Sequence, residues 1–504
     1  MNSAAKDLWV LFESQKESGL ISEMRKTLHK LDKEGYRDAF WLNAMGEIAS
    51  LEQNYRQAIR FFEQAVKLSE KPEFKLNLGN AHYFLGDYES SIRILTEHLT
   101  HHPKDAHAHL NLVNCFLKQS RYNEAQSMCD KGLELGLNPS PFWNAMGQIQ
   151  FLMGNFPDAY TLFEQAYENS PDFVDALFNR ANCLCKLGRI PEAIDDYLKC
   201  TRKDENYEVA WQNRTIACLD SGEFDKALES AEMAMRLNGK SIDNRCLMAR
   251  VRLARNELRL AREHLKESLR LQSDHVPSLI AMARVCSLEE EKEAACDWAK
   301  RIIVRAPFPS EEAVWALGLL VEMEQYEVGL HAILRAHNSV KHGKGALLKV
   351  VCLWKVGKIR EAISEMEALL KIQGEDTAEA FTLLGLLLLE TGADSLAESR
   401  LQMALEKQPG QVRATQELTR LLMKRGDADG AVLKLRQALE DNPNHPELLF
   451  HLASCQSHQG QLEEAWVLLR RAVDFGFKDA HRMMDDVNLK PLRNVHEFAP
   501  LMNG

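Results

Sequence analysis

The sequence contains no long hydrophobic run. Its longest apolar stretch, residues 381–389, is interrupted by Thr382 and Gly385, whereas a helix that spans a membrane needs about 20 predominantly apolar residues. The first residues also lack the basic segment and the apolar core of a secretory signal peptide. We therefore predict a cytoplasmic protein without a membrane span.

Basic residues are outnumbered by acidic residues. The chain has 62 Lys and Arg residues against 73 Asp and Glu residues, and its formal net charge at pH 7 is −11. Nucleic acids and anionic lipids attract proteins through clustered cationic side chains. We therefore expect no nucleic-acid partner.

The 11 cysteines are odd in number and scattered, and many stand at apolar positions of helical patterns, as Cys115 and Cys218 do. This distribution is typical of buried, reduced thiols in an intracellular protein and not of a disulfide framework.

One small residue recurs along the chain at intervals of 33, 34 or 35 positions. Such a fixed period indicates a repeat protein, in which each unit packs only against its neighbours. Eleven of the thirteen positions hold alanine. The series is Ala58, Ser91, Ala125, Ala159, Ala193, Ala227, Ala261, Ala295, Gly329, Ala362, Ala397, Ala431 and Ala465.

Other positions repeat with the same period, as the unit around Ala159 illustrates. Gly147, twelve residues earlier, predicts a close approach of two helices, and Phe163, four residues later, is a large side chain that fills the space between them. Gly154 lies five residues before Ala159, where it can end the first helix in a left-handed conformation. Each unit is therefore predicted to form two antiparallel helices.

These residues resemble the tetratricopeptide repeat, whose signature combines W-x2-L-G, A-x3-F and a closing proline. The segment from Trp143 to Gly147, followed by Ala159, Phe163 and Pro171, matches that signature almost completely. The resemblance covers residues 39–480. It implies an all-α, right-handed superhelical solenoid of about thirteen helix-turn-helix units, with helical caps and with protein binding as the function.

The irregular units predict four segments. Residues 306–309 and 338–345 interrupt the repeat pattern. The unit at Gly329 looks one residue short between its helices, because Gly318 lies only eleven residues before it. In the unit around Ala283 the segment 288–292 stands where other units have the glycine of the turn. A hinge between two arrays would explain this. The predicted segments are 1–38 (capping helices or a degenerate repeat), 39–308 (about eight units), 309–480 (about five units) and 481–504 (a cap).

The N-terminal array carries a column of asparagines at positions that face the concave groove in this family. Its motif from Asn77 to Asn80 is similar to the repeat arm of O-linked N-acetylglucosamine transferases, although no catalytic domain is present. That resemblance implies binding of an extended peptide backbone. The alternative is that asparagine is simply common at this position and adds solubility. The predicted peptide-binding residues are Asn77, Asn80, Asn111, Asn114, Asn179, Asn182 and Asn213.

The C-terminal array has no asparagine at the equivalent positions, and apolar residues stand at nearby positions that are expected to face the groove. They predict an apolar groove that could receive an amphipathic helix. Internal packing and contact with a second copy of the chain are the alternatives. The residues are Trp315, Leu319, Leu347, Val351, Trp354, Leu386 and Leu389.

A second resemblance, to repeat modules that clamp the C-terminal carboxylate of a partner, is incomplete. Asn80 and Asn111 match two of the clamp positions, but Pro141 and Ala145 stand where two cations belong. Without cations the carboxylate is not compensated, so binding of chaperone tails by this route is not expected.

No pattern of catalytic residues stands out. Five histidines cluster in the sequence: His98, His101, His102, His107 and His109. Such a cluster more commonly consists of exposed histidines at a helix end than of metal ligands. We predict a non-enzymatic scaffold or adaptor without metal or cofactor, which binds a protein or peptide and could form a homo-oligomer. The alternatives are a targeting subunit for an enzyme such as a glycosyltransferase carried on another chain, and a component of a ring or filament.

Overall fold

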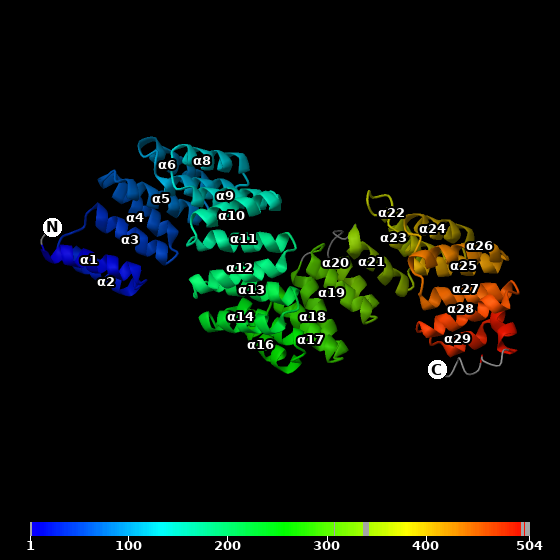
Figure 1. Cartoon of the computed structure of the whole chain (residues 1–504). Coiled ribbons are helices and arrows are strands. Elements are labelled where there is room, and N and C mark those ends of the chain that lie inside the picture. The colour runs from blue at the N-terminus through cyan, green and yellow to red at the C-terminus, as the bar shows by residue number, and fades with distance from the viewer. Residues whose placement is uncertain (1–2, 307, 336–341, 495–497, 499–504) are drawn as a thin grey trace. The chain divides into compact units, whose positions relative to one another are not determined.

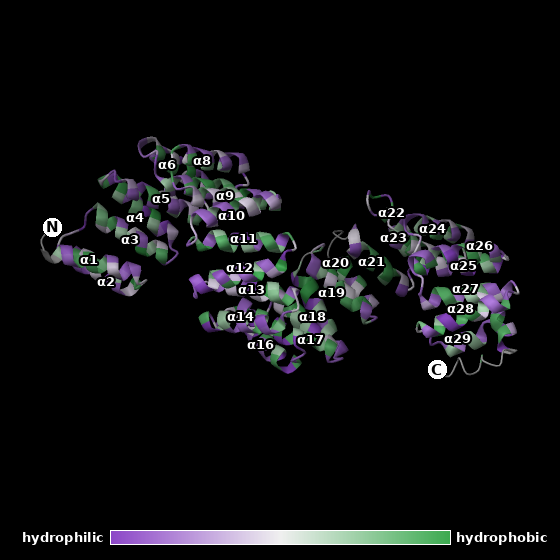
Figure 2. Cartoon of the chain, in the orientation of Figure 1, coloured by the Kyte–Doolittle hydropathy of each residue, from purple (hydrophilic) through white to green (hydrophobic). Residues whose placement is uncertain are grey.

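The computed structural model describes residues 3–306, 308–335, 342–494 and 498. Within these residues the regular structure consists of α-helices and one 3-10 helix, without any strand. The helices follow one another in tandem, and most carry both apolar and polar residues (Figures 1 and 2). The predicted all-α class is confirmed.

Thirteen helix pairs occupy the described residues between positions 39 and 474, which confirms the predicted number of repeats. In the twelve pairs other than α15 with α16, the first helix packs on the second, and within each of the two compact units defined below neighbouring pairs stack. The pairs are α3 (Ala39–Leu51) with α4 (Tyr55–Leu68), α5 (Pro72–Leu85) with α6 (Tyr88–His101), α7 (Ala106–Lys118) with α8 (Tyr122–Glu134), α9 (Pro139–Leu152) with α10 (Phe156–Asn169), α11 (Val174–Lys186) with α12 (Ile190–Lys203), α13 (Glu208–Asp220) with α14 (Phe224–Leu237), α15 (Ile242–Ala254) with α16 (Leu258–Leu271), α17 (Val276–Leu288) with α18 (Lys292–Arg305), α19 (Glu311–Glu322) with α20 (Tyr326–Arg335), α21 (Gly343–Lys355) with α22 (Ile359–Leu369), α23 (Ala378–Glu390) with α24 (Asp394–Lys407), α25 (Val412–Arg425) with α26 (Ala428–Asp441), and α27 (Pro446–His458) with α28 (Leu462–Asp474).

Further helices flank these pairs. An N-terminal pair, α1 (Ser3–Glu17) and α2 (Ile21–Lys33), precedes α3, and α29 (Ala480–Asp485) and η1 (Val487–Asn494) follow α28. The C-terminal segment is bonded to α27, because Arg482 pairs with Glu447 at 2.9 Å and Asn488 Nδ2 donates to Ser454 Oγ at 3.2 Å. Their role as caps stays a prediction.

The turn inside every pair has the same backbone conformation. In each unit, the residue five positions before the recurring small residue (the series from Ala58 to Ala465) has a φ between 58° and 87°. In the unit around Ala159 the Gly154 N–H donates to Phe151 O and the Asn155 N–H donates to Gln150 O, the bond pattern of a Schellman motif. Eight turn residues are glycines and five are not, so packing imposes this conformation even on residues that disfavour it. The five exceptions are Gln53, Ser120, Asn256, Glu290 and Glu324.

The close approach of paired helices explains the second glycine series. A Cβ atom on Gly147 would lie 2.6 Å from the ring of Phe163, and one on Gly385 would lie 2.8 Å from Leu401. Both large side chains are buried. The predicted exchange between a small residue on one helix and a large one on the other is therefore confirmed.

The unit around Gly329 corrects one sequence interpretation. This unit is not short between its helices, because its turn residue Glu324 lies five positions before Gly329, as in the other units. The position twelve before Gly329 is held by buried Leu317 and not by Gly318. A Cβ atom on Gly329 would lie 3.1 Å from Leu317 Cδ1, so the glycine on the second helix leaves room for a large residue at a first-helix position that is small in units such as that of Gly147.

The chain divides into two compact units, Met1–Ala261 (unit 1) and Arg262–Gly504 (unit 2), with the boundary inside α16. In unit 2 one continuous apolar cluster runs from Leu279 to Phe498. The core of unit 1 is divided into separate clusters, such as those of residues 95–149 and 181–251. The predicted division at residue 308 and the hinge stay predictions, since Pro307 and residues 336–341 lie outside the described residues.

The thiols lie where their sequence pattern predicts. All 11 cysteines are free, and ten are buried while Cys185 is half-buried. Burial raises the pKa of Cys129 to about 12 and the pKa of Cys183 to about 11. Among the described helices, none combines the length and the apolar character that crossing a membrane requires.

Candidate functional site

The asparagine column of unit 1 is held together by bonds between neighbouring repeats. Asn111 Nδ2 on α7 donates to Asn80 Oδ1 on α5 at 2.6 Å, and Asn213 Nδ2 on α13 donates to Asn182 Oδ1 on α11 at 2.8 Å. In each pair the two residues are 31 positions apart. The first helices of adjacent repeats are therefore joined through side-chain amides.

Two further asparagines reach back by a slightly longer interval. Asn77 Nδ2 donates to Asn43 Oδ1 at 3.0 Å, and Asn179 Nδ2 donates to Asn144 Oδ1 at 2.9 Å. Asn144 is buried, while the donors are half-buried. Asn77 Nδ2 also donates to Glu47 Oε1 at 3.4 Å, so Asn77 keeps its carbonyl oxygen alone, whereas Asn179 keeps its carbonyl oxygen and a second N–H for other partners.

Asn182 is oriented by two donors at once. Its Oδ1 atom accepts from Asn213 Nδ2 and from the Tyr197 hydroxyl, the latter at 2.6 Å. Burial, together with the neighbouring Cys185 thiol, raises the pKa of Tyr197, so its hydroxyl keeps the proton that it donates. With both acceptor positions of Asn182 occupied, its amide N–H groups are the part left for a ligand.

Asn114 and Gln148 differ from the rest of the column. Asn114 is exposed and Gln148 is half-buried, and neither amide has a side-chain or backbone partner within the part of the chain that the structure describes. Gln148 was not among the predicted site residues. The period could have found it, because Gln148 lies 34 positions from both Asn114 and Asn182.

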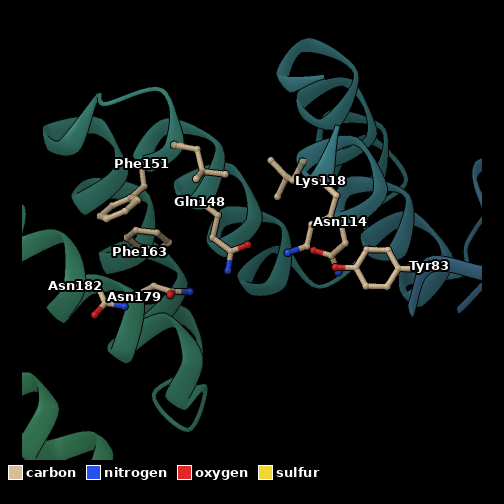
Figure 3. Close-up of a pocket in the computed structure, with 10 residues that line it drawn as sticks. Tyr83, Asn114, Lys118, Gln148, Phe151, Phe163, Asn179 and Asn182 are labelled. Atoms are coloured by element: carbon tan, nitrogen blue, oxygen red, sulfur yellow. The ribbon is translucent and has the colours of Figure 1, made fainter. Parts of the chain in front are cut away.

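These amides meet at a pocket of about 460 Å³ formed almost entirely by first helices. Figure 3 shows the Phe151 and Phe163 rings on one side and Asn114 and Tyr83 on the other, with Gln148 between them. Three of the predicted residues, Asn114, Asn179 and Asn182, therefore line one pocket. The full lining is Tyr83, Asn114, Leu117, Lys118, Gln148, Phe151, Leu152, Phe163, Asn179 and Asn182.

The apolar residues predicted in unit 2 lie on α19, α21 and α23. Leu319 and Leu386 are buried in the continuous core, with 7% and 8% of their surfaces exposed. Both are therefore packed internally. The remaining five residues are half-buried, and their use by a partner stays a prediction; they are Trp315, Leu347, Val351, Trp354 and Leu389.

Three of the five clustered histidines, His101, His102 and His107, are exposed as the sequence suggests, and two are not. His98 and His109 are buried, because one is bonded to the N-cap residue of α7 and the other to the loop before it. His98 Nε2 lies 2.8 Å from Asp105 Oδ2, and His109 Nε2 lies 2.9 Å from Pro103 O. Across the described ranges, His, Cys, Asp and Glu side chains form no group of three or more that could hold a metal ion.

Comparisons with known proteins agree with this architecture. Sequence models of the tetratricopeptide repeat match residues 42–72, 85–149, 144–207, 352–412 and 422–483. Together these segments span more than half of the chain. The chain belongs to the tetratricopeptide repeat family. Repeat solenoids of this kind use extended concave surfaces for binding.

Two relatives share part of the sequence. The Homo sapiens protein O-mannosyl-transferase TMTC3 is 25% identical over 314 residues, which are 57% of this chain and 34% of the relative. The Arabidopsis thaliana Hsp70-Hsp90 organizing protein 3 is 28% identical over 117 residues, 22% of this chain and 21% of the relative. This tetratricopeptide repeat chain thus spans 34% of the first relative and 21% of the second.

Among solved structures, a chain in the crystal structure of the APC/C hetero-tetramer Cut9-Hcn1 is similar to this tetratricopeptide repeat chain. The superposition covers 89% of this chain and 99% of the matched chain. The sequence identity is 14% and the TM-score is 0.35. A likeness of this size has no bearing on function.

Proposed function

We propose that this protein is a scaffold or adaptor that binds an extended segment of a partner protein across the pocket of unit 1. The observation that carries the proposal is the set of amides on three successive first helices, α7, α9 and α11, around one pocket. An extended peptide exposes backbone N–H and C=O groups at regular intervals, and amide side chains satisfy both.

The bonds between repeats fix what each amide offers. Asn182 presents N–H groups because its oxygen is occupied twice, and Asn179 presents its oxygen because one of its N–H groups is donated to Asn144. A preorganised donor and acceptor cost less conformational entropy on binding than free side chains do. The column therefore supports recognition of a backbone with little dependence on sequence.

The relatives support the adaptor class at a coarser level. The name Hsp70-Hsp90 organizing protein describes one that assembles other proteins. Capture of a C-terminal carboxylate by a clamp is not part of the proposal, since Pro141 and Ala145 occupy the cation positions. We place this adaptor in the cytoplasm, and we retain the half-buried residues of α19, α21 and α23 as a second contact region.

The similarity to an O-mannosyl-transferase favours one alternative, a targeting subunit for an enzyme on another chain. In that case the segment held in the pocket belongs to a substrate protein and is released after modification. A ring or filament component is the remaining alternative. The molar mass measured by light scattering distinguishes this alternative from an adaptor. A mass that keeps increasing with protein concentration would contradict a discrete adaptor.

The experiment selects decapeptides from a random displayed library on the full chain and measures the affinity of the enriched peptides by fluorescence anisotropy. The double change Asn114→Ala and Gln148→Ala removes the two amides that have no internal partner. We expect this change to weaken binding at least about tenfold, since loss of hydrogen bonds to buried partner groups costs about 1–3 kcal/mol each.

The matched control is the double change Gln64→Ala and Gln165→Ala. Both glutamines are exposed on second helices, α4 and α10, and neither lines the pocket. Thermal unfolding followed by circular dichroism checks that all proteins fold equally. Equal affinity of the Asn114/Gln148 variant and the wild type, or a library without enriched peptides, would remove the basis of the proposal.

A further inference from the structure

The pocket of unit 1 contains one charged side chain. Lys118, near the end of α7, is exposed and is the sole Lys, Arg, Asp or Glu among the ten lining residues. Throughout the described part of the chain no carboxylate lies within 4.0 Å of its ammonium group. Lys75 and Lys199 do have such partners, Glu97 at 3.0 Å and Asp196 at 2.9 Å. Lys186 has none in the described part of the chain, so it is the place beside the pocket that sets Lys118 apart.

The positions equivalent to Lys118 in the neighbouring repeats are apolar and open to solvent. Phe84, 34 residues earlier, is 60% exposed, and Leu152, 34 residues later, is 54% exposed. An unpaired cation thus stands between two exposed apolar side chains on one edge of the groove. In a chain with a net charge of −11, an uncompensated lysine beside a pocket marks where an acidic group of a partner would be attracted.

The opposite wall supplies apolar contact area. Phe151 and Phe163 lie together on one side of the pocket (Figure 3). Phe163 is buried against Gly147 of the paired helix and backs the Phe151 ring, so the surface open to a ligand belongs to half-buried Phe151 and exposed Leu152. An aromatic wall of this kind gains most from a large apolar side chain that leaves water to reach it.

The lining residues also indicate the direction in which an extended ligand would cross the pocket. They come from α5, α7, α9, α10 and α11, so the pocket extends to both sides of the helix that carries Lys118. Amides lie on α7 beside Lys118 and again on α9 and α11. Tyr83 on α5 lies on the other side of α7, so a segment that contacts both Tyr83 and the amides of α9 and α11 passes Lys118, which fits the middle of a chain and not its last residue.

We propose that Lys118 and the Phe151–Phe163 wall make this pocket selective for extended segments in which an Asp or Glu side chain lies within two residues of a large apolar side chain. This inference rests on the proposed function, which supplies the backbone contacts. It adds the side-chain chemistry of the partner. Because an exposed ion pair contributes modestly and is screened by salt, the expected preference is about fivefold at low ionic strength.

The test uses random decapeptides displayed through their C-termini, so that no free terminal carboxylate is present. Three forms of the full chain are compared: the wild type, Lys118→Glu and the control Lys186→Glu. Lys186 occupies the same repeat position two units later, is exposed and does not line the pocket. We expect Asp or Glu near Phe, Leu or Met to be enriched on the wild type and on the control, and Lys or Arg to replace the acidic residue on Lys118→Glu.

The enriched peptide is then synthesised with blocked ends, together with a partner in which Glu is replaced by Gln. The Glu form should bind the wild type about fivefold more tightly at low salt, and the two should bind Lys118→Gln equally. Enriched peptides without acidic residues, unaffected by Lys118→Glu, would overturn this inference and leave the backbone proposal standing. A library without enriched peptides removes both proposals. Binding restricted to peptides with a free C-terminal carboxylate overturns the choice of a side-chain acid.

Discussion

The two units of this chain use one repeat in two ways. In unit 1 the groove positions of the first helices hold amides that bond to one another across repeats. In unit 2 the corresponding positions are apolar from α17 to α23, as Ala281, Leu348 and Leu383 are, and polar in the last two repeats, at Glu417 and His451; its core is one continuous apolar cluster. The turns and the helix pairs are the same in both. The polarity of the groove positions therefore differs between repeats without any change in the backbone plan.

The largest expected effect tests whether the continuous core makes unit 2 more cooperative. Leu387 in unit 2 and Leu177 in unit 1 are both 0% exposed, so either Leu→Ala change should cost about 3 kcal/mol of unfolding free energy. Hydrogen exchange should show lower protection across unit 2 for Leu387→Ala, and across α10 to α13 alone for Leu177→Ala. If the loss of hydrogen-exchange protection is equally local in the two variants, unit 2 is not more cooperative than unit 1.

The second effect compares two helix glycines. Gly147→Ala places a Cβ atom 2.6 Å from the Phe163 ring and should cost about 2 kcal/mol. Gly318→Ala places one 4.0 Å from Leu348, where nothing has to move, and should gain up to about 1 kcal/mol from helix propensity. Urea unfolding measures both. A destabilised Gly318→Ala would mean that Gly318, not Leu317, holds the close-approach position.

The third effect concerns the left-handed turns. Glu290 has a φ of 59°, a conformation that glycine adopts without steric cost, so Glu290→Gly should stabilise unit 2 by about 1 kcal/mol. Gly154→Ala should destabilise unit 1 by a similar amount, because φ there is 84°. Glu290→Ala is the control, and it should leave the melting temperature nearly unchanged. A stabilising Glu290→Ala would point to charge and not to backbone strain.

The smallest effect tests the amide pairs that set unit 1 apart. The single changes Asn182→Ala and Asn213→Ala and the double change form a cycle around the 2.8 Å bond between these side chains. We expect a coupling energy of about 0.5–1 kcal/mol, the size of one intramolecular hydrogen bond. Additive changes in unfolding free energy would show that the bond does not join the two repeats.

Much of the fold could be predicted because the period repeats the same local physics. Gly147 and Phe163, or Gly385 and Leu401, complement each other within one pair of helices, and such a rule is visible in the spacing alone. The same reasoning failed at Gly329, where Leu317 occupies the position that Gly147 holds in its unit and packs against Gly329. The spacing alone suggested the nearby Gly318, because it does not show which side chain faces the paired helix.

The site was predicted less completely, since its details depend on contacts between repeats. The column of asparagines was identified, but the sequence does not say that Asn111 and Asn213 are bonded to earlier repeats while Asn114 is not. Gln148 was missed because the search followed one residue type and not one chemical group. His98 and His109 were misjudged because their burial depends on how α6 meets α7.

The thirteen left-handed turns bear on how such a chain changes its length. Each turn closes with bonds inside its own repeat, as those from Gly154 to Phe151 and from Asn155 to Gln150 do. Gene duplication or deletion of one whole repeat would therefore leave every remaining turn intact and alter only the junction. Copy number can drift between descendants of one ancestral gene while the unit itself is conserved, and the groove lengthens or shortens by one helix at a time.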